Sequence, residues 1–217
     1  HQGNTRFTPP LRHPAAPYLF VSRMELSMAS PTAQGSKDEL KYEFALLAFQ
    51  YNVAGRTAFF HQINPVCGTL LHHAVEMSLK AALTDILTLP ELRRLNHSLP
   101  RIWAAFTRLF PDANTPEFNQ VVDHLDKFWD LRYPDFILAK GAMIEFVLFR
   151  EHIIPHQSGK PCEKPTVPKF LLVLEDIDAL QELILEKANI NPPAYTNSMS
   201  KEAREYLSRH NRHASKF

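Results

Sequence analysis

The chain has 217 residues, of which 45% are hydrophobic, and this is enough to build one domain with a sizeable core. Its two cysteines exclude a disulfide scaffold, and its six glycines argue against a turn-rich β architecture. The net charge is +1, and it divides into +2 for residues 1–35, +3 for 201–217 and −4 for the residues between them, so the mildly acidic middle of the chain is not a dedicated nucleic-acid surface.

The first 35 residues contain five prolines and are predicted to form a flexible leader, because proline interrupts helices. The chain begins with His1, so we expect part of this leader to be non-native, with Met24 or Met28 as the native start. No apolar run approaches the roughly 20 residues of a membrane span, and no signal peptide is recognisable. We therefore expect a cytoplasmic protein with no membrane contact and with reduced cysteines.

Four helices are predicted in the first part of the domain. The first covers 36–62, with Ser36 as its N-cap and acids in its first turn. The second covers 65–87 and is apolar over a wide arc, which indicates a central, buried helix. The third covers 99–110. The fourth begins after Thr115, a capping residue that is followed by proline at the first helical position.

The second part of the chain is less regular. The apolar run 143–149 is predicted to be a strand or the start of a helix, and a Pro-rich loop follows at 156–168. The last long helix is predicted at 167–188, before a basic polar tail at 191–217. Residues 36–190 are thus expected to form an all-α, antiparallel up-and-down bundle of about five helices, with a long loop or short β excursion before the last helix.

Two features raise the possibility of chemistry on the second helix. His72 and Glu76 have the i, i+4 spacing of metal ligands, but no third ligand is evident, so we predict neither a metal nor a cofactor. Cys67 lies near the start of the same helix, where a thiol can be activated, although a small core residue is the expected role. The sequence has no Gly-rich phosphate loop and no GxSxG motif.

Basic and aromatic residues suggest a phosphate-binding surface further along. A basic cluster spans 93–108 and includes His97 and Arg101, with Trp103 expected to pack in the core. Arg132 and Tyr133 lie where Pro134 ends the fourth helix. They are predicted either to form a capping turn with an Arg–Asp ion pair or to be presented to a phosphate or carboxylate.

Three segments together resemble the HEPN (higher eukaryotes and prokaryotes nucleotide-binding) family: HAVEMSLKAAL at 73–83, HSLP at 97–100 and LRYPD at 131–135. The resemblance covers about 38–188. It implies a helical bundle that commonly forms a homodimer. It also implies a role as a ribonuclease toxin, as the partner of a minimal nucleotidyltransferase, or as a non-catalytic binding module.

Ribonuclease members of that family carry Arg, four to six residues, and then His near the start of the final long helix. Residues 167–188 contain neither Arg nor His, and the pair Arg204 and His210 has this spacing only in the polar tail. We therefore expect a module without catalytic residues that dimerises and binds a nucleotide, RNA or a protein partner. The alternatives are a metal-independent ribonuclease that uses Arg204 and His210, and a scaffold that binds only proteins.

The binding site expected for the non-catalytic module combines the basic and aromatic residues of the three motifs and their surroundings. Cations are expected to contact phosphate, while an imidazole and a phenol donate hydrogen bonds. The expected ligand-binding residues are Lys80, His97, Arg101, Arg132 and Tyr133.

Overall fold

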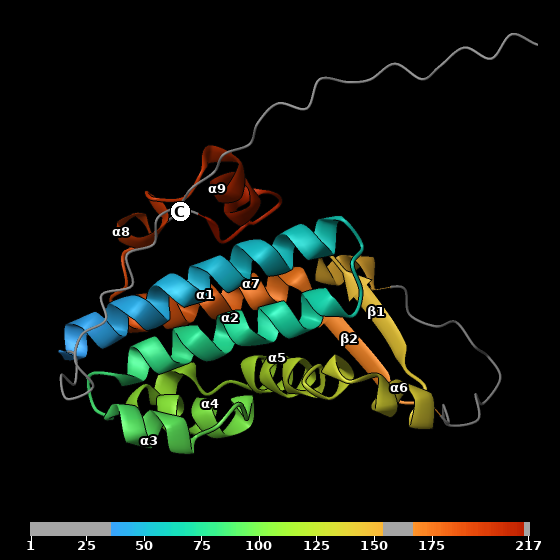
Figure 1. Ribbon diagram of the computed structural model, residues 1–217, viewed down its shortest axis with the longest axis horizontal. Coiled ribbons are helices and arrows are strands. Elements are labelled where there is room, and N and C mark those ends of the chain that lie inside the picture. Colours follow the sequence, from blue (N-terminus) through green and yellow to red (C-terminus); the bar gives the residue numbers. More distant parts are fainter. Residues whose placement is uncertain (1–35, 154–166, 215–217) are drawn as a thin grey trace, which may run out of the picture. The chain divides into compact units, whose positions relative to one another are not determined.

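The computed structural model describes residues 36–153 and 167–214, and these residues are mostly helical (Figure 1). The expected leader and most of the expected Pro-rich loop lie outside these ranges. Within them the chain forms nine α-helices, three short 3-10 helices and a parallel sheet of two strands. The mainly helical class and the β excursion are confirmed, whereas the expected count of about five helices is too low.

The elements follow the chain in a simple order. The α-helices are α1 (Lys37–Phe60), α2 (Val66–Leu83), α3 (Leu89–Arg94), α4 (Leu99–Leu109), α5 (Pro116–Lys127), α6 (Pro134–Lys140), α7 (Leu174–Lys187), α8 (Pro193–Thr196) and α9 (Lys201–Ser208). The strands are β1 (Met143–Val147) and β2 (Lys169–Val173), and the 3-10 helices are η1 (Pro111–Ala113), η2 (Asp130–Arg132) and η3 (Arg150–His152). None of the helices in the described ranges has the length and apolar character needed to cross a bilayer.

Helices α1 and α2 form an antiparallel hairpin at the centre of the fold (Figure 1). The predicted cap Ser36 starts α1: its hydroxyl accepts from the Glu39 N–H, while the Glu39 carboxylate accepts from the Ser36 N–H. Gly55 allows a close approach to α2, because a Cβ there would lie 2.7 Å from the Leu71 side chain. Most of α2 is buried, as its wide apolar arc predicts.

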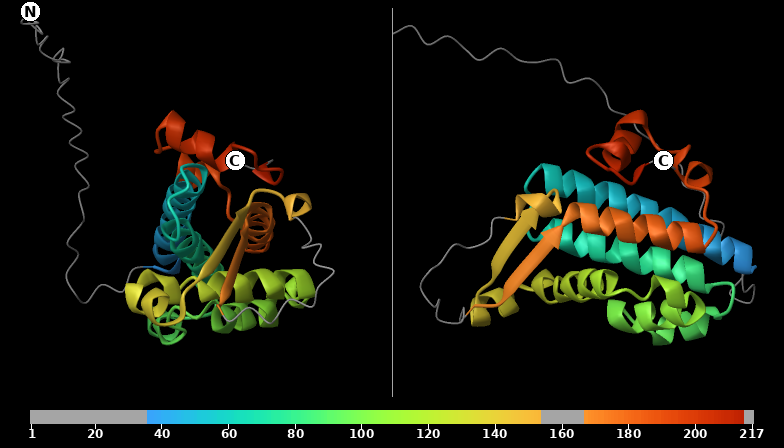
Figure 2. Two further views of the ribbon diagram at one scale, coloured as in Figure 1. Left: turned by 90° about the vertical axis from the view of Figure 1, so that its right-hand side faces the viewer. Right: turned by 180° about the vertical axis from the view of Figure 1, so that it is seen from behind.

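Helix α2 is covered from several sides. Helix α7 runs beside it, and α4 and α5 pack beneath it (Figure 2). At the start of α2, a Cβ on Gly68 would lie 2.1 Å from the Phe128 ring, so only glycine fits against this phenylalanine. Phe128 itself is fully buried. The core of the domain is therefore organised around α2, which places the polar residues of that helix in buried positions.

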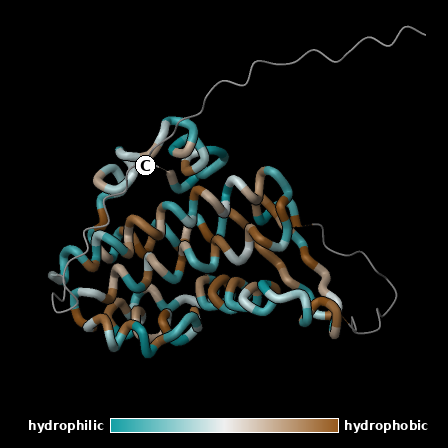
Figure 3. The backbone as a smooth tube through the Cα atoms, viewed as in Figure 1, coloured by the Kyte–Doolittle hydropathy of each residue, from teal (hydrophilic) through white to brown (hydrophobic). Residues whose placement is uncertain are grey.

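The strands pair in parallel, with Met143 opposite Lys169 and Val147 opposite Val173. Hydrophobic residues dominate both strands (Figure 3). The predicted helix at 167–188 is wrong in its first part, since Lys169–Val173 is β2 and α7 begins only at Leu174. Both runs are short and almost continuously apolar, and such runs do not distinguish a buried strand from a helix by periodicity.

The segment predicted to be a polar tail contains α8 and α9, and both contact α1. Leu207 on α9 is buried. From α1, the buried guanidinium of Arg56 donates to the Asp178 carboxylate on α7 and to the backbone carbonyls of Tyr206 and Arg209. These contacts attach α9 to the bundle.

Candidate functional site

A buried carboxylate on α2 is the centre of the candidate site. Glu76 is fully buried, and three side chains lie within hydrogen-bond distance of its carboxylate. Lys80, one turn later, donates to Oε1 at 2.6 Å; His73, one turn earlier, lies 3.2 Å from Oε2 through Nδ1; and His97, before α4, lies 3.0 Å from Oε1 and 3.1 Å from Oε2. Helical spacing places His73, Glu76 and Lys80 on one side of α2.

The balance of burial and hydrogen bonding keeps this carboxylate charged. Burial alone would raise the pKa of Glu76, but the hydrogen bonds from its two imidazoles and its ammonium partner outweigh burial and lower the pKa to about 2. The Glu76 side chain is therefore an anion at neutral pH. It has no contact with solvent itself, and only its partner side chains reach the surface. His73 is 22% exposed and His97 is 52% exposed, so the cluster opens to solvent on the imidazole side.

His72 has a different role from the one its spacing suggests. Its ring nitrogens face the backbone carbonyls of Leu125 and His97, at 3.3 and 3.0 Å, and its Nε2 lies 3.9 Å from Glu76. Burial lowers the pKa of His72, so the ring is neutral and donates to only one of these carbonyls. His72 thus supports the segment that carries His97 and is not a member of the Glu76 donor set.

A stack of cationic and aromatic side chains continues from the cluster to the surface. The His97 ring lies 4.5 Å from the Trp129 ring at 19°, and the Arg132 guanidinium lies 3.4 Å from the same indole. Arg132 is also 4.7 Å from the Tyr133 ring. Both Arg132 and Tyr133 are exposed, the latter by 58%.

The structure brings together most of the residues predicted to bind a ligand. Lys80 and His97 meet at Glu76, and Trp129 links His97 to Arg132 and Tyr133. Lys80 is nearly buried and paired with Glu76, so its ammonium holds the carboxylate.

Arg101 is the predicted residue that points elsewhere. It is exposed on α4 and donates to the carbonyl of Arg94, and no contact in the described part of the chain connects it to the stack.

The alternative catalytic pair lies on the other side of α1, in the C-terminal segment. Arg204 lines a surface hollow along α8 and α9, whereas the His210 ring lies 5.8 Å from the Phe60 ring at the end of α1. No contact among the described residues joins the two side chains, so the structure gives the ribonuclease alternative no further support.

Sequence reasoning missed His73 and Trp129. His73 has the i, i+3 spacing to Glu76, which is as compatible with a shared helix face as the i, i+4 spacing of His72. Trp129 was not among the expected ligand-binding residues, yet its ring is only partly buried and lies between the cluster and Arg132. The position of His97 could be found only from the tertiary fold, because it lies on a different element.

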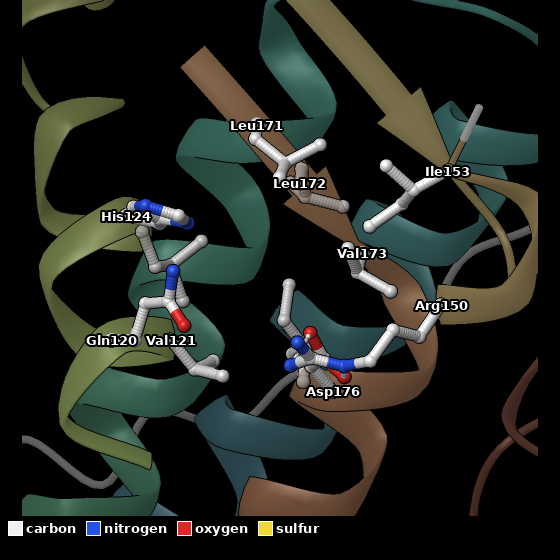
Figure 4. Close-up of a pocket in the computed structure, with 11 residues that line it drawn as sticks. Gln120, Val121, His124, Arg150, Ile153, Leu171, Leu172, Val173 and Asp176 are labelled. Carbon is white, nitrogen blue, oxygen red and sulfur yellow. Dashed lines mark hydrogen bonds and ion pairs between the residues drawn. The ribbon is translucent and has the colours of Figure 1, made fainter. Parts of the chain in front are cut away.

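A second hollow lies between α5, β2 and η3 (Figure 4). Its volume of about 30 Å³ has room for a water molecule and not for a nucleotide. Its charged groups are already paired, since the Arg150 guanidinium makes two hydrogen bonds to Asp176, at 3.1 and 2.7 Å. This hollow is therefore a packing defect beside an ion pair.

Cys67 has the expected structural role. The thiol is fully buried, and burial raises its pKa to about 12 despite a hydrogen bond from the Gly68 backbone. A thiol with this pKa is protonated at neutral pH and is a poor nucleophile.

Comparisons of the chain with protein-family models, with curated proteins and with solved structures each gave no significant match. The HEPN resemblance therefore rests on its three sequence segments. In the structure these segments meet: Glu76 and Lys80 come from the first, His97 from the second, and Arg132 and Tyr133 from the third.

Proposed function

We propose that this protein is a non-catalytic, HEPN-like helical module that binds a nucleotide or single-stranded RNA at the surface formed by His97, Trp129, Arg132 and Tyr133. The observation that supports this proposal is the exposed stack of imidazole, indole and guanidinium groups. Such stacks suit ligands that combine a flat base with a phosphate.

The phosphate would be bound by Arg132. Its guanidinium has no carboxylate partner within the described ranges and lies against aromatic rings, so its N–H groups are available for a bidentate contact with an anion. The indole is already packed against His97 and Arg132. A base would therefore stack on the exposed guanidinium plane or on the Tyr133 ring, and both groups accept planar ligands.

Lys80 would act through another residue. Its ammonium is bonded to Glu76 at 2.6 Å and to the carbonyl of Asn96 at 3.0 Å, and Asn96 directly precedes His97 in sequence. This pairing fixes the carboxylate that orients the His97 ring. Lys80 is thus proposed as a positioning residue for the binding surface. The resemblance also implies a homodimer, which sedimentation of the purified chain would measure.

Binding of labelled single-stranded RNA across a salt series, with ATP and GTP as competitors, tests this proposal. Arg132→Gln should weaken binding about tenfold and reduce the salt dependence, since stacking and charge-assisted contacts contribute about 1–3 kcal/mol each. Arg101→Gln is the matched control, because it removes an exposed arginine that lies outside the stack. It should leave affinity within about twofold of the wild type.

Three results would overturn the proposal. Absence of binding to RNA and to nucleotides would favour a module that contacts only proteins. An equal loss in Arg132→Gln and Arg101→Gln would indicate diffuse electrostatic attraction instead of a site. The same incubations, run on a gel, report RNA cleavage. Cleavage that His210→Ala abolishes would establish the ribonuclease alternative.

A further inference from the structure

We infer that His73, Glu76 and His97 form a binding site for a divalent transition-metal ion, with Zn²⁺ the best fit. The three side chains offer donor atoms that all lie within 4.8 Å of one another. This site is additional to the proposed nucleotide surface and does not depend on it, although His97 belongs to both.

The distances from the Glu76 carboxylate to the two imidazoles match those of a metal site, and all the donor atoms lie within 4.8 Å of one another. In a tetrahedral zinc site with bonds of about 2.0–2.1 Å, neighbouring donor atoms are about 3.3 Å apart. The observed separations from the Glu76 carboxylate are 3.2 Å to His73 Nδ1 and 3.0–3.1 Å to His97 Nδ1. An ion could therefore be inserted with small movements of the side chains.

His97 contacts both oxygens of the Glu76 carboxylate, but Lys80 and His73 each contact a different one, which leaves Oε2 for the ion. Lys80 donates to Oε1, and His73 contacts Oε2. An ion between Oε2 and the two imidazoles would leave the lysine hydrogen bond intact. Lys80 would then orient the ligand from outside the coordination shell, as groups around metal sites commonly do. Its positive charge also opposes the ion, so we expect weaker binding than a free carboxylate would give.

The imidazoles can expose a lone pair to the ion by a change of tautomer. At present each Nδ1 faces the carboxylate and carries the proton of that hydrogen bond. On binding, the proton would reside on Nε2, which has no hydrogen-bond partner among the described residues for either His73 or His97. Stacking on Trp129 holds the His97 ring in place.

The composition and exposure of the cluster select the type of ion. Two imidazoles and one carboxylate favour Zn²⁺ or Co²⁺ over Mg²⁺ and Ca²⁺, which prefer oxygen ligands. Three protein ligands leave a fourth position for water. That position would lie on the solvent side, because the carboxylate is fully buried whereas His97 is 52% exposed.

Titration of the full chain with Zn²⁺ by calorimetry, and with Co²⁺ by visible absorption, tests the site without any nucleotide. The wild type should bind one equivalent of Zn²⁺ and should give the intense visible bands of four-coordinate Co²⁺. His73→Gln and His97→Gln should each weaken binding at least tenfold and remove the Co²⁺ bands. His61→Gln is the control, since His61 is exposed at the end of α1 and contacts Tyr206.

The inference is overturned if His73→Gln and His97→Gln bind Zn²⁺ as tightly as the wild type, because binding would then reside at other histidines. It is also overturned if the wild type gives no visible Co²⁺ bands. Circular dichroism of each variant establishes that it is folded. Addition of a metal chelator to the RNA-binding assay keeps its outcome and that of the metal titration distinguishable.

Discussion

Two buried carboxylates with basic partners lie in the described part of the domain, and they differ in what surrounds those partners. Asp178 on α7 is paired with Arg56, and both side chains are almost completely inaccessible. The remaining hydrogen bonds of Arg56 go to backbone carbonyls of the C-terminal segment. Glu76 on α2 is equally buried, but its imidazole partners extend to the surface.

The comparison separates a structural ion pair from a candidate site. Burial raises the pKa of Asp178 to about 6 even though the Arg56 charge opposes this shift. For Glu76 the hydrogen bonds prevail, and the pKa falls to about 2. A carboxylate held by several donors, some of them exposed, can exchange a donor for a ligand. A carboxylate enclosed with a single arginine cannot exchange that partner without leaving a buried charge unpaired.

The largest expected effect on stability comes from breaking the buried pair of Arg56 and Asp178. Arg56→Met would leave the Asp178 carboxylate buried without its partner and would remove the hydrogen bonds that attach α9. The free energy of unfolding should therefore fall by about 3–5 kcal/mol. Urea denaturation measures this loss. In the same assay Lys80→Met should lose only about 1–2 kcal/mol, because Glu76 keeps its imidazole donors.

The double variant Arg56→Met/Asp178→Leu serves as the control for this prediction. It removes both charges and should recover much of the stability that the single variant loses. A single Arg56→Met variant within about 1 kcal/mol of the wild type would contradict the structural role assigned to the pair.

An intermediate effect on the free energy of unfolding is expected when the pH is lowered. The pKa of Glu76 is about 2 in the folded state against an ordinary value of 4.5, so the unfolded state binds more protons between these values. The resulting stability is complete above about pH 4.5 and is lost as the pH falls towards 2, and it amounts to about 3 kcal/mol. Denaturation at several pH values should show a steeper acid loss for the wild type than for Glu76→Gln/Lys80→Met. Equal slopes would mean that Glu76 is not held as an anion.

The smallest effect is expected at the open end of the Glu76 cluster. His97→Gln should lower the free energy of unfolding by about 1 kcal/mol or less, because the imidazole is half exposed and the carboxylate keeps two other donors. Thermal unfolding measures this. A loss as large as that of Arg56→Met would show that the exposed imidazole is part of the structural core and would remove the contrast between the two clusters.

Local signals in the sequence predicted several parts of the fold. Ser36 and Thr115 cap helices as expected, and Tyr133 is extended before Pro134. These features depend on neighbouring residues alone. Strand β2 was mistaken for helix, since five apolar-rich residues fit both structures until their partner strand is known. Helix α9 was missed because its attachment involves Arg56, a residue on the first helix.

The sequence predicted most of the residues of the candidate site, but not how they contact one another. Four of the five expected residues lie in or beside the Glu76 cluster, which their sequence segments suggested. The role of Lys80 differs from the expected one, because its ammonium is paired with Glu76. The sequence analysis expected this ammonium to contact phosphate. The proposed metal donors were not predicted as a set, because the sequence analysis paired Glu76 with His72 instead of His73, and because His97 approaches α2 only after the chain turns through α3.

Gly68 and Phe128 occupy one shared volume, because a Cβ at residue 68 would lie 2.1 Å from the ring. The two positions are therefore expected to covary among homologous chains: a larger residue at the first should accompany a smaller one at the second. This paired constraint joins the start of α2 to the segment just before Trp129. It offers a way to recognise distant relatives in which the polar residues of the cluster have diverged.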